Sequence, residues 1–190
     1  MTISAFDIAI LGAGPVGRVL ALMLARVAPD PARIALLAGA SPAPVTPAAA
    51  IPVADPRVLA MNHGSRVLLE SLNAWPAKAA DILNIHVSQR GRLGRSVIQH
   101  TDFDVPQLGC VVAYSALHAK LEERVAASGV TLLSGPPAQI DGQDGDGVRI
   151  SQGDTALSCR IAVQSDGAGA SDLRRLSLIH ISEPTRRRGI

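Results

Sequence analysis

Residues 6–17 read FDIAILGAGPVG, a short apolar run that leads directly into the pattern Gly-x-Gly-x-x-Gly. A helix-forming segment, residues 16–27, follows at once. In a dinucleotide-binding turn, the first glycine (Gly12) lets the chain leave the strand tightly. Gly14 lets a pyrophosphate approach the backbone, and Gly17 lets the helix pack closely on the sheet. The stretch therefore predicts a strand, turn and helix that bind a dinucleotide.

The start of the predicted helix is also suited to a phosphate. Pro15 belongs in the first helical turn, where its missing N–H is not needed. The N–H groups that remain there have no partner within the helix, and they carry a partial positive charge. Since strand and helix lie on the correct sides of the glycines, a turn without a ligand is the less favoured interpretation. The turn does not distinguish FAD from NAD(P).

The second strand is predicted at residues 33–37, RIALL, a continuous apolar run typical of a parallel strand buried on both faces. An Asp or Glu usually closes this strand and accepts hydrogen bonds from the adenosine ribose. Here Ala38, Gly39 and Ala40 take that place, and the next carboxylate is Asp55. The ribose must therefore be held by backbone, by another side chain, or less tightly.

The composition indicates a globular protein with one sizeable core, because 47% of the 190 residues are hydrophobic and 18% are charged. The formal net charge is +2, and it lies entirely in residues 176–190, which contain three arginines and one acidic residue, Glu183. The remaining chain has no basic stretch interleaved with aromatic residues. Binding to nucleic acid is therefore not expected.

Cysteine usage and the N-terminus bear on the cellular compartment. Cys110 and Cys159 lie far apart, without metal-ligand spacing, and are expected to be free thiols in a reducing compartment. The N-terminus lacks the positive charge of a secretory signal. The apolar stretch of residues 8–28 is interrupted by glycines, a proline and arginines, which argues against a membrane span. We expect a cytoplasmic protein that holds no metal.

The segment after the second strand changes character twice. Residues 38–54 contain four prolines and no charge, which predicts an extended surface excursion; a plain linker is favoured over a functional lid. A helix is predicted from about residue 64 to residue 75. The residues expected on its apolar side are Val67, Leu68 and Leu72.

Two antiparallel hairpins are predicted further along. Residues 84–89 and 95–99 both alternate in polarity and flank a glycine-containing turn. Residues 141–147 form an Asp- and Gly-rich tract that joins two further strands. This tract superficially resembles a calcium loop but lacks the terminal acidic residue of an EF-hand.

A helix is predicted at residues 115–127 between these hairpins, with Ser115 as its N-cap and Gly129 just beyond its end. A short strand at residues 130–133 follows. The residues expected to face the core from this helix are Leu117, Leu121 and Val125.

A second informative motif covers residues 160–174, RIAVQSDGAGASDLR, where a strand ends at Asp166 and Gly167 and a helix begins near Ser171. Asp166 can accept hydrogen bonds from a ribose or from backbone, and an arginine at the end of the motif can pair with phosphate. We expect the strands before the two motifs to be parallel neighbours. Gly12 and Asp166 would then share the carboxyl edge of one sheet, where open α/β sheets bind ligands.

At this point the chain resembles the class A FAD-dependent aromatic hydroxylases. The motifs that carry the likeness, in order, are residues 12–17, 57–62 and 166–174. The segments that look closest to the ubiquinone-biosynthesis branch are residues 62–72, 86–94 and 105–112. The resemblance covers residues 5–175. It implies a Rossmann-like FAD-binding domain with a parallel sheet, plus part of an antiparallel layer on the substrate side.

The resemblance also implies a reaction. FAD is reduced by the co-substrate NAD(P)H and, with O2, one oxygen atom is transferred to an electron-rich phenol. A polyprenylated ubiquinone precursor would imply association with the inner face of a membrane or with a biosynthetic complex. The cofactor-binding residues carried over by position are Gly12, Gly14, Pro15 and Gly17 at the pyrophosphate, Arg57 on the flavin side, and Asp166 and Gly167 for FAD and the approach of NAD(P)H.

Several conspicuous residues have ordinary alternatives. Arg57 could be a surface arginine in an ion pair. His63 is interpreted as the start of a helix rather than a catalytic group, and Cys110 as a core residue rather than a reactive thiol. The arginines of the first hairpin could border a substrate cavity, although a solvated face is the favoured interpretation; they are Arg90, Arg92 and Arg95.

The family's later Gly-Asp motif and the second half of its substrate domain are not found in this sequence. We therefore expect residues 1–175 to be an incomplete FAD-binding domain with substrate-side elements inserted at about residues 84–100. Residues 176–190 resemble a translated adapter sequence and are expected to be non-native; a genuine divergent tail is the alternative. A non-catalytic dinucleotide-binding fragment stands beside the hydroxylase as a second hypothesis, and an NAD(P)-dependent reductase is less favoured.

Overall fold

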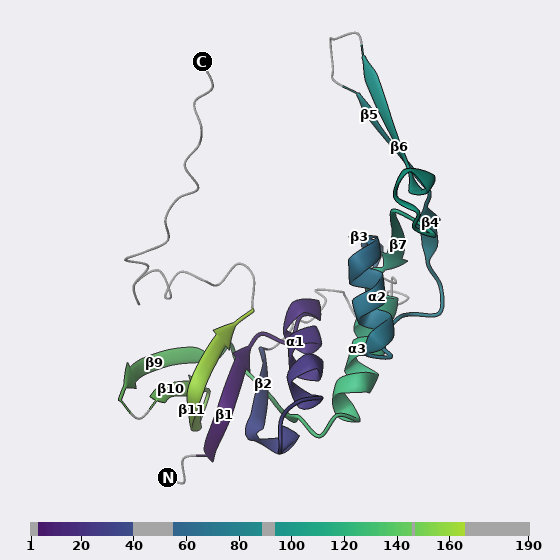
Figure 1. Cartoon of the computed structure of the whole chain (residues 1–190). Coiled ribbons are helices and arrows are strands. Elements are labelled where there is room, and N and C mark those ends of the chain that lie inside the picture. Colours follow the sequence, from purple (N-terminus) through teal and green to yellow (C-terminus); the bar gives the residue numbers. More distant parts are fainter. Residues whose placement is uncertain (1–3, 40–54, 89–93, 146, 166–190) are drawn as a thin grey trace, which may run out of the picture.

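The computed structural model describes residues 4–39, 55–88, 94–145 and 147–165. It has a mixed α/β fold built on a six-stranded sheet (Figure 1). Four neighbouring strands of this sheet are parallel, and an antiparallel pair is added at one edge. The strands in spatial order are β8 (Thr131–Gly135), β2 (Ile34–Gly39), β1 (Ser4–Leu11), β11 (Thr155–Gln164), β10 (Gly147–Gln152) and β9 (Gln139–Asp144). The predicted parallel sheet is confirmed for β8, β2, β1 and β11.

The register of the sheet brings the ends of three strands together. Leu11 of β1 lies opposite Leu37 of β2 and opposite Gln164 of β11. Because these strands are parallel, the turn after β1 and the residue after β11 both lie at the same carboxyl edge. The glycine turn of the first motif and Ser165 of the second motif therefore lie side by side.

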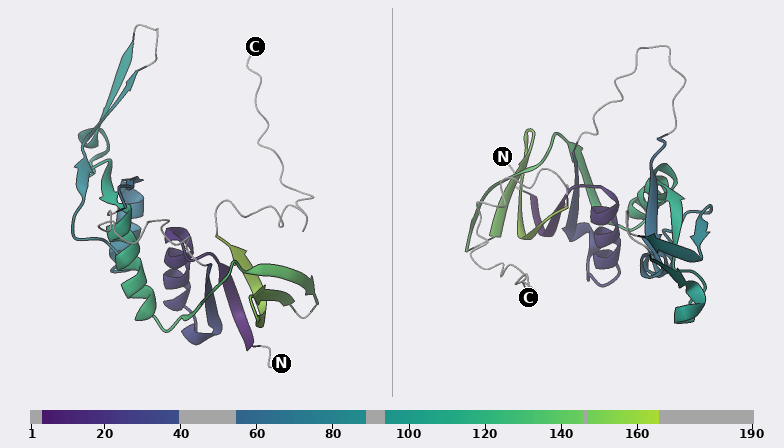
Figure 2. Two further views of the ribbon diagram at one scale, coloured as in Figure 1. Left: turned by 180° about the vertical axis from the view of Figure 1, so that it is seen from behind. Right: turned by 90° about the horizontal axis from the view of Figure 1, so that it is seen from above.

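Both faces of the central strands are covered, which explains their continuous apolar runs. Ile10 and Leu36 pack on one face, against α1 (Pro15–Ala25) and α3 (Tyr114–Ala126). Leu11 and Leu37 point to the other face, where the antiparallel edge supplies Ile150 from β10. Figure 2 shows the two helices on one side of the sheet and the β9–β10 pair on the other side of β11.

The intervening chain forms a second antiparallel sheet and a long hairpin. The sheet has the order β3 (Val58–Asn62), β7 (Gly109–Ala113) and β4 (Ala80–Ile82), with α2 (His63–Ser71) beside it. The hairpin of β5 (Asn84–Ser88) and β6 (Arg95–Gln99) extends away from the rest of the chain (Figure 1). The predicted hairpin and the predicted antiparallel layer apart from the main sheet are confirmed.

The prediction for the apolar side of the helix at α2 is confirmed for Leu72 but wrong for Val67 and Leu68. Val67 is 49% exposed and Leu68 is 37% exposed, whereas Leu69 is 3% exposed and belongs to the core. The helix ends at Ser71, earlier than expected, and Leu72 is buried just after it. The sequence pattern allowed either face, and packing beside β3 and β7 selects the one that carries Leu69.

Two further details of the sequence analysis need correction. Ser115 is not the N-cap of α3, because the helix continues directly from β7 and begins at Tyr114; its N-cap is Ala113, which makes no side-chain capping bond. Arg33 closes a short 3₁₀ helix (Pro31–Arg33) rather than opening β2. A second 3₁₀ turn (His100–Phe103) follows β6.

The helical core positions expected for α3 are confirmed, since Leu117, Leu121 and Val125 are all buried. Cys110 and Cys159 are buried free thiols, as predicted, and burial raises the pKa of both. Over the part of the chain that the structure describes, no helix is long and apolar enough to cross a membrane, and no cluster of His, Cys, Asp and Glu could hold a metal ion.

Candidate dinucleotide-binding site

The turn after β1 requires a glycine at its first position. Gly12 has φ of 111°, in the left-handed region that residues with a side chain rarely adopt. Its N–H donates to the carbonyl oxygen of Leu37 at 2.9 Å, which ties the turn to the end of β2. The role predicted for Gly12, a tight exit from the strand, agrees with this geometry.

Gly17 is required by packing rather than by conformation. A Cβ at this position would lie 2.0 Å from the carbonyl oxygen of Gly12 and 2.6 Å from Oγ of Ser165. Both distances are far inside van der Waals contact, and the nearer atom is backbone. The helix α1 can therefore lie this close to the turn only because residue 17 has no side chain.

Gly14 is different from the other two glycines, because the fold itself does not require it. Its φ of −69° and ψ of 178° suit any residue, and a Cβ built on it meets no protein atom within 4 Å. The space beside its backbone is therefore open to a ligand. Gly14 is also the N-cap of α1 without a capping side chain, and Pro15 is at the start of the helix. This arrangement fits an anion such as a pyrophosphate.

A cavity of about 500 Å³ opens at this turn. It lies over the carboxyl ends of β1, β2 and β8 and against α1 and α3, so elements distant in the sequence form its walls. The residues that line it are Gly12, Ala13, Gly14, Arg18, Ala38, Gly39, His118, Glu122, Leu132, Ser134 and Ser165.

Arg18 is the buried charged group of this cavity, with only 7% of its surface exposed. Its Nε donates to the carbonyl oxygen of Ala13 at 2.7 Å, and its Nη1 donates to the carbonyl oxygen of His118 at 3.4 Å. Its Nη1 also lies 3.8 Å from a carboxylate oxygen of Glu122. The guanidinium thus connects the glycine turn to α3. The sequence analysis did not identify Arg18, His118 or Glu122 as part of a site, because no local pattern connects them.

The end of β11 is bonded to the same turn through Ser165. The N–H of Ser165 donates to the carbonyl oxygen of Leu11 at 2.7 Å, and its hydroxyl donates to that of Gly12 at 2.8 Å. The residue that directly precedes Asp166 is therefore held against the glycine turn. Asp166 and Gly167 themselves lie outside the described residues, as do all the residues that follow them.

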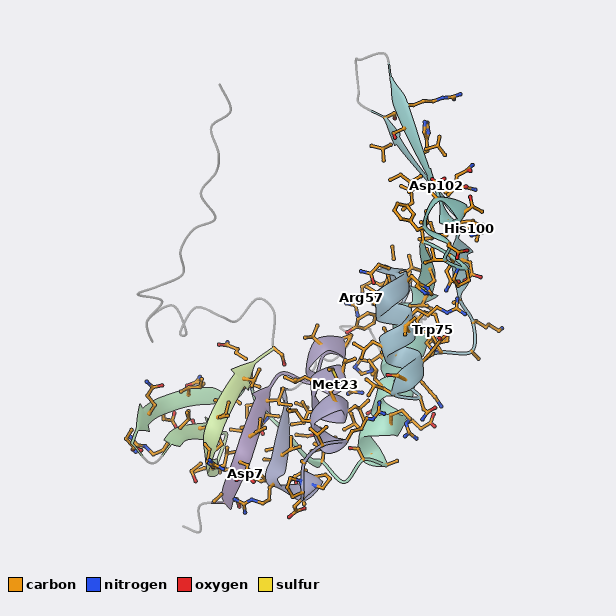
Figure 3. All side chains as sticks on the ribbon, viewed as in Figure 1. Asp7, Met23, Arg57, Trp75, His100 and Asp102 are labelled. Atoms are coloured by element: carbon orange, nitrogen blue, oxygen red, sulfur yellow. The ribbon has the colours of Figure 1, made fainter. Side chains whose placement is uncertain are left out.

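Arg57 is not among the residues that line the cavity. It forms a two-pronged ion pair with Asp55, in which Nη2 and Oδ2 are 2.5 Å apart, and this lowers the pKa of Asp55 to about 2. Its guanidinium lies 4.1 Å from the centre of the Tyr114 ring, which in turn stacks on His118. Figure 3 shows Arg57 beside α2. Among the described residues, Tyr114 and His118 connect Arg57 to the wall of the cavity.

The other residues considered from the sequence have structural roles. His63 is the first residue of α2, and its N–H donates to the carbonyl oxygen of Leu108 at 3.1 Å, as its interpretation as a helix start requires. Cys110 is fully buried in β7. Arg95 is exposed at the start of β6, and Arg90 and Arg92 fall outside the described residues.

No protein-family model matches the sequence, and no curated protein matches it. Solved structures do match in fold. The flavin-dependent monooxygenase PieE, solved in complex with FAD and substrate, has a TM-score of 0.65 and 20% identity over 90% of this chain and 32% of its own. PqsL, a probable FAD-dependent monooxygenase from Pseudomonas aeruginosa, has a TM-score of 0.63 and 18% identity over 91% of this chain and 45% of its own.

A third match is the p-nitrophenol 4-monooxygenase PnpA from Pseudomonas putida DLL-E4, with a TM-score of 0.63 and 14% identity. It aligns over 92% of this chain and 44% of its own length. At these identities the comparisons establish the fold: this chain has the fold of part of the flavin-dependent monooxygenases. It spans between about a third and a half of the length of these structures.

Proposed function

We propose that this chain is the FAD-binding part of a flavin-dependent monooxygenase that hydroxylates a phenolic ring, using NAD(P)H and O2. The observation that carries the proposal is Gly14, a glycine that the fold does not need, beside open space at the N-terminus of α1. Such a position has a clear use if the backbone must come close to a pyrophosphate. The similar folds of PieE and PqsL, both described as monooxygenases, support FAD as the dinucleotide.

The proposed roles follow the walls of the cavity. Gly12, Gly14, Pro15 and Gly17 would hold the pyrophosphate at the start of α1. Asp166 and Gly167, which follow Ser165 in the sequence, would serve the FAD ribose and the approach of NAD(P)H. Arg57 would act on the flavin side, with its charge balanced by Asp55.

Bound FAD would supply the redox chemistry, accepting a hydride from NAD(P)H and passing one oxygen atom of O2 to the ring. The part of the protein described here would bind and orient the cofactor. The guanidinium of Arg18, bonded to the carbonyl oxygen of Ala13, would help to hold the turn in place. Such preorganisation spares the ordering cost when the nucleotide binds.

The substrate proposed is a phenolic precursor of ubiquinone, polyprenylated and met at the cytoplasmic face of a membrane or within a biosynthetic complex. This finer proposal rests on the resemblance of residues 62–72, 86–94 and 105–112 to that branch of the hydroxylases. Product analysis of the longer enzyme to which this chain would belong, under isotopically labelled O2 and with phenols that carry or lack a polyprenyl chain, tests it. One labelled oxygen on the ring of the polyprenylated phenol is expected; hydroxylation of the unprenylated phenol alone would exclude the proposed substrate, and an unlabelled product would exclude monooxygenase chemistry.

A second candidate function is a dinucleotide-binding module without catalysis. It rests on the same open space beside Gly14, which accounts for nucleotide binding without a catalytic group. The two candidates share the nucleotide site and differ in turnover. NAD(P)H consumption by the 190-residue chain, in the presence of FAD and a phenol, would decide for the first.

Binding of FAD to the purified chain tests the site itself, read from quenching of flavin fluorescence. Gly14→Ala should weaken binding by at least about tenfold, because its Cβ would enter the space proposed for the pyrophosphate. Gly145→Ala is the matched control: a Cβ there also meets nothing within 4 Å, but it lies in the β9–β10 turn. Equal affinities of the two variants, each folded as judged by circular dichroism, would contradict the proposal.

A further inference from the structure

We propose that Glu122, on α3, accepts hydrogen bonds from the adenosine ribose in place of the carboxylate that is missing after β2. The inference rests on the proposed function, since it assumes that a nucleotide lies on the glycine turn. It answers the question left by Ala38 and Gly39, which occupy the place where the ribose acceptor usually closes the second strand.

Glu122 and the end of β2 belong to one cavity. Ala38 and Gly39 line it on the sheet side, and Glu122 lines it from α3. The carbonyl oxygen of Ala38 already accepts a hydrogen bond from Nε2 of the buried Gln152 at 2.9 Å. The backbone at the end of β2 is therefore partly engaged. Among the described residues that line the cavity, Glu122 is the one that carries a carboxylate.

The carboxylate of Glu122 has accepting capacity to spare. Nη1 of Arg18 lies 3.8 Å from a carboxylate oxygen of Glu122 and Nδ1 of His118 lies 4.0 Å from it, and neither nitrogen is close enough for a hydrogen bond. The side chain is 61% exposed. Glu123, the next residue, is different, because its two oxygens accept hydrogen bonds from Nζ of Lys120 at 2.8 and 2.9 Å.

The charges around Glu122 favour a ribose with free hydroxyls over one that carries a 2′-phosphate. Arg18 is buried, and its guanidinium donates to the carbonyl oxygens of Ala13 and His118 and lies 3.8 Å from Glu122. Burial, and then the charge of Arg18, lowers the pKa of His118, which favours the neutral form of the ring. A phosphate placed beside the carboxylate of Glu122 would be repelled by it, and the guanidinium of Arg18, the cation in the described wall of the cavity, is held by two carbonyl oxygens.

A neighbouring hydroxyl supports the same position. Ser134 of β8 lies opposite Ala38 in the sheet register and also lines the cavity. A carboxylate that accepts and a hydroxyl that can donate or accept are a suitable pair for the two hydroxyls of a ribose. Glu122 and Ser134 come from different elements, α3 and β8, which no spacing along the chain connects.

The test compares ADP with 2′-deoxy-ADP on the purified chain, by ligand-observed NMR up to millimolar concentration. The unmutated chain should bind ADP about tenfold more tightly than 2′-deoxy-ADP, a difference in binding free energy of about 1.4 kcal/mol. In Glu122→Ala this preference should disappear, whereas the matched variant Glu123→Ala should retain it. Both positions are exposed on α3, and thermal melting by circular dichroism checks that both variants fold.

The outcomes separate the inference from the proposed function. If ADP binding depends on Gly14 but the preference over 2′-deoxy-ADP survives in Glu122→Ala, the inference is wrong and the nucleotide site stands. Tighter binding of adenosine 2′,5′-bisphosphate than of ADP would also overturn it, because that ligand places a phosphate beside the carboxylate. A chain that binds neither ADP nor its deoxy analogue would overturn the proposed function and the inference together.

Discussion

Replacing Gly17 with alanine should destabilise the fold, although alanine is the better helix former. The new Cβ would lie 2.0 Å from the carbonyl oxygen of Gly12 and 2.6 Å from Oγ of Ser165. Ordinary contact begins near 3.4 Å, so α1 and the turn must separate by roughly 1.4 Å. The hydroxyl of Ser165 can rotate away, but the carbonyl oxygen belongs to backbone that is held by the bond from Gly12 N–H to Leu37.

The size of the effect follows from three contributions. Overpacking of this kind costs about 1–3 kcal/mol. Loss of the bond from Ser165 Oγ to the Gly12 carbonyl oxygen costs about 0.5–1.5 kcal/mol. The helix preference of alanine over glycine returns about 1 kcal/mol. The net loss in free energy of unfolding should be about 2 kcal/mol, which lowers Tm by about 4–8 °C for a chain of this length.

Urea and thermal unfolding, followed by far-ultraviolet circular dichroism, measure this loss. Gly145→Ala serves as the matched control, because its Cβ meets nothing within 4 Å, and its free energy of unfolding should stay within about 0.5 kcal/mol of the parent. If Gly17→Ala unfolds at the same midpoint as the parent, the close contact between α1 and the turn is not a constraint in solution. The packing argument for this glycine would then fail.

Three other predictions concern different parts of the chain. Gln152→Leu should lower the free energy of unfolding, measured in urea, by about 1–3 kcal/mol. Nε2 of this buried side chain donates to the carbonyl oxygens of Ala38 and Pro136, and both would lose their donor. An unchanged midpoint would show that the two carbonyl oxygens find other donors. Arg57 lowers the pKa of Asp55 from 3.8 to about 2, so the stabilisation by this pair is present above pH 4 and is lost as the pH falls towards 2. An NMR titration of the Asp55 carboxyl should show its pKa returning towards 3.8 in Arg57→Gln, and a pKa that stays near 2 would assign the shift to another group. The purified and washed chain should be colourless or carry substoichiometric flavin, because the later Gly-Asp motif that the resemblance implies is not found in this sequence. Stoichiometric FAD in the absorbance spectrum would contradict this.

Local chemistry was sufficient to predict the first unit of the fold. The apolar run before Gly12, the glycine spacing and the proline at the helix start predict β1, the turn and α1, and all three are confirmed. The buried positions of α3 and the β5–β6 hairpin were also predictable, since each rests on a periodicity of 3.6 or 2 within one element. Where two faces of a helix were both partly apolar, as in α2, periodicity could not choose, and Leu69 was missed.

The sequence by itself determined which residues form the glycine turn, because the conformation at Gly12 depends on neighbours in the chain. Only the tertiary structure decided why Gly17 has no side chain and what could replace the ribose carboxylate. Ser165 meets the turn from 153 residues away, and Glu122 faces the end of β2 from another element. Contacts at such separations arise from the order of strands in the sheet and the packing of helices on it. No pattern within a short stretch of residues encodes them.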